Sequence, residues 1–140
     1  MDYILENLAI GNFDEATAPA VDIDALLCVA GEKELSFVRR LYCKVPLEDM
    51  QPIPAPQLIQ AVRFIREYIA DHRIMVFCNA GVGRAPSVVV AYLCCIENYG
   101  FGEAVEFAAS RKPYMSILPD LILSIDKAKG LLARPRAKSA

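Results

Sequence analysis

The sequence predicts one compact α/β domain with a central, mostly parallel sheet and helices on both of its faces. The chain has 140 residues, which suits a single domain. Short apolar segments of strand length alternate along it with segments of helical period. Strands that alternate with helices pair in parallel, and a parallel sheet is buried under helices on both faces. We therefore expect one domain over residues 1–133, followed by a flexible basic tail over residues 134–140.

Four segments have the composition of short strands. The first, YILENLAIGN, holds two apolar stretches and ends at Gly11 and Asn12. The other three are mostly apolar runs, at residues 24–30, 41–45 and 73–77. The segment from Pro46 to Pro56 contains four prolines, so we expect a loop with a stiffened backbone there.

Helical periodicity begins after these prolines. Leu58, Val62 and Ile65 are spaced four and three residues apart, with polar side chains on the other face. Pro56 suits a first helical turn, because an N–H at that position has no intrahelical partner. Three further helices are expected, at residues 86–99, 102–110 and 118–132.

Composition and charge exclude several classes of function. The net charge is −2 with both signs interspersed, which argues against a nucleic-acid partner. The longest apolar run, Val88 to Ile96, is too short to cross a membrane, and the N-terminus lacks the pattern of a secretory signal. Five cysteines without a CxxC spacing and a single histidine argue against a metal site. We expect a cytoplasmic monomer without membrane partner, metal or cofactor.

The segment CNAGVGR, residues 78–84, has the composition of an anion-binding loop. It follows the apolar run 73–77, and ligands in open α/β sheets bind beyond the carboxyl ends of the strands. Gly81 and Gly83 let successive N–H groups point into one concavity, and the following helix adds the positive end of its dipole. Arg84 adds a planar fork that matches two phosphate oxygens. The expected substrate-binding residues are Asn79, Ala80, Gly81, Val82, Gly83 and Arg84.

Cys78 lies at the start of this loop. The groups that bind an oxyanion also stabilise a thiolate, so one site would hold a phosphate and a nucleophile aimed at phosphorus. This arrangement indicates phosphoryl transfer through a cysteinyl-phosphate intermediate. The alternative is that Cys78 is a small buried core residue, as free cysteines commonly are.

The chain resembles the protein tyrosine phosphatase superfamily, and specifically its small dual-specificity branch. CNAGVGR resembles the family's C-x5-R signature, YCKVPLEDM its general-acid loop, and RKPYMSILPD the loop before its last helix. The resemblance covers most of the chain. It implies a phosphatase fold and the hydrolysis of phosphomonoesters, with phosphotyrosine and phosphoserine/threonine proteins as the default substrates. It also implies that Cys78 and Arg84 are catalytic.

The resemblance also implies a general acid. Asp49 matches the acid position of the family, and a carboxylate on such a loop can protonate the leaving oxygen and later activate water. Glu48 is the neighbouring alternative, and either residue can instead be a solvated loop charge.

Two alternative functions are also consistent with the sequence. CNAGVGR is similar to the C-x-A-G-x-G-R loop of laforin and the plant starch phosphatases, which suggests a phosphoglucan phosphatase. Phe77 and Ala85 stand where the family has a histidine and a hydroxyl, which suggests a phosphate-binding pseudophosphatase that acts as an interaction domain.

Cys28 is the remaining candidate residue. In some relatives, a cysteine near the nucleophile forms a reversible disulfide with it, and Cys28 can take this role. The alternative is a packed core cysteine.

Overall fold

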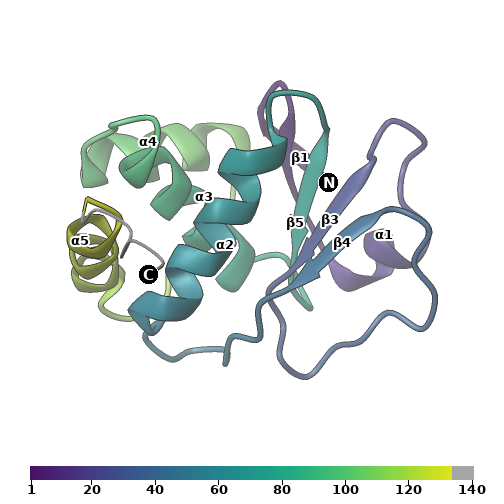
Figure 1. Ribbon diagram of the computed structural model, residues 1–140, viewed down its shortest axis with the longest axis horizontal. Helices are drawn as coiled ribbons and strands as arrows, with labels where there is room; N and C mark the ends of the chain where they lie inside the picture. The colour runs from purple at the N-terminus through teal and green to yellow at the C-terminus, as the bar shows by residue number, and fades with distance from the viewer. Residues whose placement is uncertain (134–140) are drawn as a thin grey trace, which may run out of the picture.

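A five-stranded sheet forms the centre of the protein (Figure 1). The structure, a computed structural model, describes residues 1–133, and the expected tail at 134–140 lies outside the described residues. The strand order is β1-β2-β5-β3-β4. The pairing of β1 with β2 is antiparallel and the other three pairings are parallel, which confirms the mostly parallel sheet. The strands are β1 (Asp2–Leu5), β2 (Leu8–Gly11), β3 (Ala25–Cys28), β4 (Leu41–Lys44) and β5 (Ile74–Phe77).

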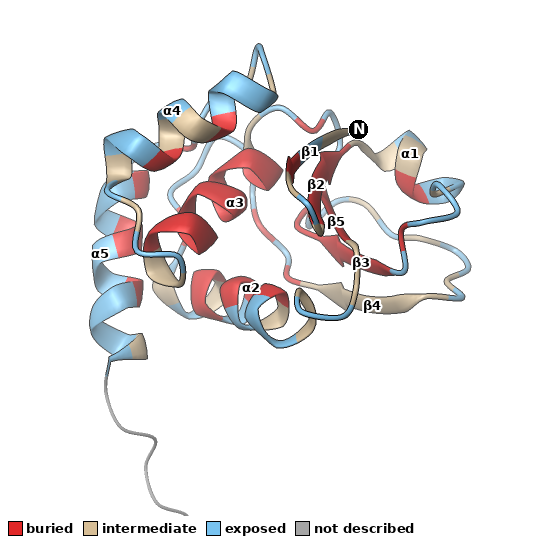
Figure 2. Ribbon diagram, turned by 90° about the horizontal axis from the view of Figure 1, so that it is seen from above, coloured by how far each residue is buried: buried red, intermediate tan, exposed pale blue. Residues whose placement is uncertain are grey.

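Helices cover the two faces of the sheet unequally. Figures 1 and 2 show one helix, α1, on one side and the other four on the opposite side. This arrangement confirms the α/β fold with helices on both faces. The helices are α1 (Phe13–Thr17), α2 (Ala55–Tyr68), α3 (Arg84–Cys95), α4 (Phe101–Arg111) and α5 (Leu121–Leu132).

The short helix α1 is the element that the sequence pattern did not indicate. It has five residues, too few for a helical period to be visible. A capping box holds its start: the N–H of Glu15 donates to the Asn12 side chain, and the N–H of Asn12 donates to the Glu15 carboxylate. The turn at Gly11 and Asn12 therefore ends β2 and begins a helix at once.

Helix α3 has different bounds from the predicted 86–99. It begins at Arg84, because the N–H of Ser87 already donates to the carbonyl of Gly83, the N-cap residue. It ends at Cys95, since Asn98 takes a left-handed conformation with φ 61°. A left-handed residue after a helix is a common way to end it. The early start brings Arg84 into the first turn of the helix.

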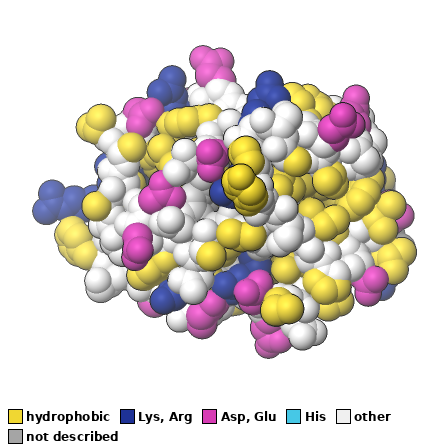
Figure 3. All heavy atoms as spheres, turned by 180° about the vertical axis from the view of Figure 1, so that it is seen from behind, with side chains coloured by type: hydrophobic (Ala, Val, Ile, Leu, Met, Phe, Trp, Pro, Cys, Tyr) yellow, Lys and Arg dark blue, Asp and Glu magenta, His cyan; other side chains and the backbone are white. Residues whose placement is uncertain are grey.

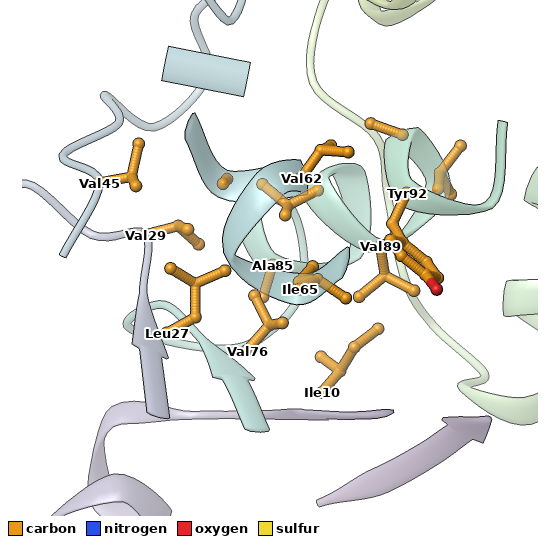
Figure 4. Packing of buried hydrophobic residues seen from close by; sticks show 14 of the residues in the cluster. Ile10, Leu27, Val29, Val45, Val62, Ile65, Val76, Ala85, Val89 and Tyr92 are labelled. Atoms are coloured by element: carbon orange, nitrogen blue, oxygen red, sulfur yellow. The ribbon is translucent and has the colours of Figure 1, made fainter. Parts of the chain in front are cut away.

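The core lies between the sheet and helices α2 and α3. Figure 2 shows β5, β3 and most of α3 as buried, and every residue of β5 is buried. In Figure 4, Leu27 and Val76 point from the sheet toward Ile65 of α2 and Val89 of α3. This packing fixes the position of α3 relative to β5, and so fixes the two ends of the loop that joins them.

The surface carries charges of both signs. Acidic and basic side chains are interspersed on the face shown in Figure 3. Within residues 1–133, no helix is long and apolar enough to cross a membrane.

Candidate active site

The loop from Cys78 to Arg84 joins the carboxyl end of β5 to the first turn of α3. Cys78 follows β5 directly and is 2% exposed. Gly81 has φ 75°, a conformation that favours glycine. A Cβ on Gly81 would also lie 2.7 Å from the carbonyl oxygen of Gly11, at the end of the neighbouring strand β2. Both the turn and the close approach of two backbones therefore require glycine here.

Residues outside this loop donate hydrogen bonds to three of its carbonyl groups. The N–H of Ser116 donates to the carbonyl of Val82 at 2.8 Å. The N–H of Phe13 donates to the carbonyl of Asn79 at 3.0 Å. The Ser87 hydroxyl donates to the carbonyl of Gly83 at 2.7 Å and accepts the N–H of Leu118 at 2.9 Å. Because these bonds occupy carbonyl groups of the loop, they fix its shape without using its N–H donors.

Arg84 is held almost completely inside the protein, with 3% exposure. Its Nη1 and Nη2 both donate to the carboxylate of Glu32, with 2.8 Å between Nη2 and Oε2, and Nη1 also donates to the Leu47 carbonyl at 3.1 Å. The guanidinium lowers the pKa of Glu32 from its usual 4.5 to about 2. The buried Nε has no hydrogen-bond partner among residues 1–133. Arg84 therefore keeps one oriented donor unused.

A cavity of about 400 Å³ opens at this loop. Three segments surround it: the loop after β4, the loop from β5 to α3, and the connection between α4 and α5. Its lining residues are Asp49, Met50, Cys78, Asn79, Ala80, Val82, Gly83, Arg84, Ser116, Ile117, Leu118 and Pro119. Every residue expected at the site contributes to this lining except Gly81.

Asp49 lies at the edge of the same cavity. Its Oδ1 is 3.9 Å from Nε of Arg84 and accepts the N–H of Met50 at 3.0 Å. Its side chain is 61% exposed, so solvent reaches the carboxylate. Glu48 lines a neighbouring hollow that does not include Cys78. The geometry therefore favours Asp49 over Glu48 as the carboxyl group of this site.

The comparison with known families agrees with this geometry. Residues 10–126 match the family model described as "Dual specificity phosphatase, catalytic domain". The chain belongs to the dual-specificity phosphatase family. One curated relative is the protein-tyrosine-phosphatase IBR5 of Arabidopsis thaliana, which is 32% identical over 65 residues. That match covers 46% of this chain and 25% of the relative, so the chain spans only part of the relative's length.

Solved structures of the family share the fold. A mouse putative dual specificity phosphatase has a TM-score of 0.80 at 20% identity, over 94% of this chain and 87% of the other. Human DUSP28 has a TM-score of 0.78 at 17% identity, over 94% of this chain and 97% of the other. The protein tyrosine phosphatase-like fold that the resemblance implied is confirmed.

The two departures from the family's pattern both lie in the interior. Phe77 is the last residue of β5 and is fully buried. Ala85 is fully buried too, and Figure 4 shows it among Leu27, Ile65 and Val76. Each of these side chains therefore adds to the hydrophobic core beneath the loop.

Cys28 ends β3, beside β5 as expected, but it pairs with Phe77 rather than with Cys78. Side chains alternate between the faces of a sheet along each strand, so Cys28 shares a face with Phe77. Its thiol points to the carbonyls of Ala30 and Lys33, at 3.6 and 3.8 Å. These contacts favour a packed core cysteine over a disulfide partner of Cys78.

Three of the residues that shape the site were missed in the sequence. Glu32 stands in the charged stretch GEKE and resembles a solvated surface residue until the fold brings it to Arg84, 52 positions away. Ser87 and Ser116 were not singled out in the sequence either, although Ser116 stands in the family-like loop RKPYMSILPD. A signal for Ser87 was present in its spacing from Gly83, since a serine hydroxyl in a helix often bonds the carbonyl four residues earlier.

Proposed function

We propose that this chain is a cysteine-dependent phosphatase that hydrolyses phosphomonoesters, with phosphotyrosine and phosphoserine/threonine proteins as the substrates that its family implies. One observation carries the proposal. The buried Nε of Arg84 lacks an acceptor in the part of the chain that the structure describes, at a cavity that Cys78 and Asp49 also line. A buried donor without a partner is costly, and a phosphate oxygen would satisfy it.

Substrate binding would use the loop backbone. The N–H groups of residues 79–84 and the guanidinium of Arg84 donate to the phosphoryl oxygens. The carbonyls of Asn79, Val82 and Gly83 already accept hydrogen bonds from residues outside the loop, which supports this use of the N–H groups. Glu32 and the Leu47 carbonyl hold the guanidinium in place. The phosphorus atom then lies above Cys78.

The first chemical step transfers the phosphoryl group to sulfur. The Cys78 thiolate attacks phosphorus, a P–S bond forms, and the ester P–O bond breaks. The leaving oxygen takes a proton from the carboxyl group of Asp49. Arg84 and the loop stabilise the charge on the phosphoryl oxygens during this transfer.

The second step releases phosphate. A water molecule gives a proton to the Asp49 carboxylate and attacks phosphorus, and the P–S bond breaks to restore the thiolate. Besides water, these two steps use only backbone N–H groups and side chains of this chain. We therefore propose that it needs no metal or cofactor. We also propose that it acts as a cytoplasmic monomer.

The test compares the wild type with Cys78→Ser on a small aryl phosphate. A serine hydroxyl is a far poorer nucleophile near neutral pH, so we expect turnover to fall to background while tungstate still binds the intact loop. Cys43→Ser, a half-buried cysteine outside the cavity, is the matched control and should keep wild-type activity.

Other outcomes separate the alternatives. Wild-type turnover by Cys78→Ser would contradict the mechanism. Tungstate binding without any turnover by the wild type would make the chain a phosphate-binding pseudophosphatase. Phosphate release from phosphorylated starch, faster than from phosphopeptides, would favour the phosphoglucan phosphatase.

A further inference from the structure

Exposed apolar side chains surround the mouth of the cavity. Met50, Val82 and Ile117 line it, and they are 77%, 40% and 38% exposed. They come from three different segments: the loop after β4, the loop after β5 and the connection from α4 to α5. We call these three residues the apolar rim. Apolar side chains gathered around a polar site are typical of a surface that contacts a ligand or a partner.

Met50 is the most exposed member of the apolar rim and has an unfavourable backbone. Its φ is 59°, in the left-handed region where a residue with a Cβ is disfavoured. Its N–H donates to Oδ1 of Asp49 at 3.0 Å, so one turn fixes both the carboxylate and the thioether. Unfavourable backbone conformations that persist at a site are often part of its function.

Charge around the cavity limits what the apolar rim can accept. Within residues 1–133, Arg84 is the only cation in the lining, and two of its nitrogens already bind Glu32. Glu32 and Glu48 line the hollow next to the cavity, which also includes Asp49. A second phosphate group on a substrate would meet these carboxylates without a cation to neutralise it. The site is therefore suited to one phosphate and ill suited to a polyanion.

The side chains that line the cavity are also poorly suited to sugar substrates. None of the described residues that line the cavity is aromatic. The apolar rim instead offers aliphatic side chains, and the flexible thioether of Met50 can adapt to apolar groups of different shape. These surfaces suit the side chains of a protein better than the face of a glucan ring.

We propose that the apolar rim selects singly phosphorylated protein segments in which an apolar residue adjoins the phosphorylated one, and that Met50 is its main specificity-determining residue. The proposal rests on the proposed phosphatase function. The phosphate binds at Arg84 and the loop, while the neighbouring apolar side chain contacts Met50 and Ile117 and is removed from water. An acidic neighbour would instead lie near Asp49 and Glu48.

The experiment measures kcat/KM for matched phosphopeptides. One carries leucine and the other glutamate beside the phosphorylated residue, a third carries two phosphates, and a small aryl phosphate is the reference. The wild type should prefer the leucine peptide over the glutamate peptide by about tenfold, the range expected for one apolar contact. The doubly phosphorylated peptide should be the poorest of the three.

Two variants of Met50 separate the effect of its apolar contact from the effect of charge at the cavity mouth. Met50→Gly removes the thioether and suits the left-handed backbone, so the leucine preference should fall to about twofold without a new charge. Met50→Lys should raise kcat/KM for the doubly phosphorylated peptide relative to the leucine peptide by about fivefold. Val21→Lys places the same charge at a 96% exposed residue outside the cavity and should leave both ratios unchanged.

Failure of this inference differs from failure of the proposed function. Two results would overturn the role of the apolar rim alone, provided that the aryl phosphate is hydrolysed. In the first, all peptides have equal kcat/KM. In the second, Met50→Gly leaves the ratio of kcat/KM between the leucine and glutamate peptides unchanged. Faster hydrolysis of a phosphatidylinositol bisphosphate in vesicles than of any peptide would also overturn that role. Absence of hydrolysis of every substrate, including the aryl phosphate, would overturn the phosphatase function and the apolar rim's role with it.

Discussion

Two cysteines lie at the same end of neighbouring parallel strands, yet their surroundings differ. Cys28 ends β3 and Cys78 follows β5, and they are 0% and 2% exposed. The Cys28 thiol faces the carbonyl oxygens of Ala30 and Lys33. Cys78 instead begins a loop that leads to a buried guanidinium and lines an open cavity.

A position at the end of a strand is therefore not sufficient for a reactive thiol. Burial raises the pKa of Cys28 and so favours a thiol that keeps its proton. The residues that come after the strand decide the chemistry. After Cys78 come a glycine with positive φ, N–H groups left free by the loop's outside contacts, and Arg84 in the first turn of α3.

The largest expected effect comes from Arg84, the group that Cys28 lacks. Arg84→Lys keeps the charge but loses the planar fork that bonds Glu32 and leaves Nε for the substrate. We expect kcat on an aryl phosphate to fall by about 100-fold or more, as for removal of a donor to the transition state. Arg63→Lys on the exposed face of α2 is the matched control. Near-normal kinetics for Arg84→Lys would mean that the arginine is structural.

The next effect concerns Asp49, which shares a cavity with Cys78. Asp49→Asn should slow esters with basic leaving groups by roughly 100-fold and esters with good leaving groups much less, because only the former need a proton. The kcat/KM values over a series of aryl and alkyl phosphates measure this dependence, because they report the step that releases the leaving group and not the later hydrolysis of the cysteinyl phosphate. Glu48→Gln should leave it unchanged, and the reverse pattern would move the acid to Glu48.

Glu32 should have a smaller effect, because it orients Arg84 through hydrogen bonds without lining the cavity itself. Glu32→Gln should lower kcat by roughly tenfold, less than Arg84→Lys, since the guanidinium remains but loses its anchor. The carboxyl group has a pKa of about 2 in the fold against its usual 4.5. The unfolded chain thus binds more protons between these values, and the pair stabilises the fold fully above about pH 4.5 and less as the pH falls toward 2.

Urea unfolding of both proteins across this pH window measures the effect. The wild type should lose more free energy of unfolding than Glu32→Gln as the pH falls. Equal losses in the two proteins would show that the ion pair contributes nothing to stability.

Cys28 itself should give the smallest effect on catalysis. Cys28→Ser keeps a donor near the carbonyls of Ala30 and Lys33, so kcat should stay within about twofold. Burying a hydroxyl in place of a thiol should reduce the free energy of unfolding by about 1 kcal/mol. A loss of turnover comparable to that of Cys78→Ser would break the distinction between the two cysteines.

Much of the difference between the surroundings of Cys28 and Cys78 could be predicted from the sequence. The apolar run 73–77, the two glycines and the arginine predicted a strand, an anion-binding loop and a helix. The structure has the strand and the helix with a loop between them, and anion binding by that loop stays a prediction. Local residues set these features, so a local pattern was sufficient. The pairing of β3 with β5 was expected from the family resemblance alone.

The remaining features depend on contacts between distant parts of the chain. Glu32 reaches Arg84 only because β3 lies beside β5, and the approach of Gly81 to Gly11 needs β2 on the other side. The apolar rim joins three loops whose exposure no pattern in the chain indicates. Helix α1 was missed because a five-residue helix depends on its cap and not on a period.

The most direct test of the account is to identify the residue that carries phosphate during turnover. The enzyme is mixed with an aryl phosphate, quenched with acid at early times and digested, and the phosphorylated peptide is identified by mass spectrometry. We expect phosphate on the sulfur of Cys78 in the wild type and none on Cys28. Asp49→Asn should carry more phosphate on Cys78 than the wild type, because its second step lacks a base. Phosphate on another residue, or rapid turnover without any phosphate on Cys78, would contradict the mechanism.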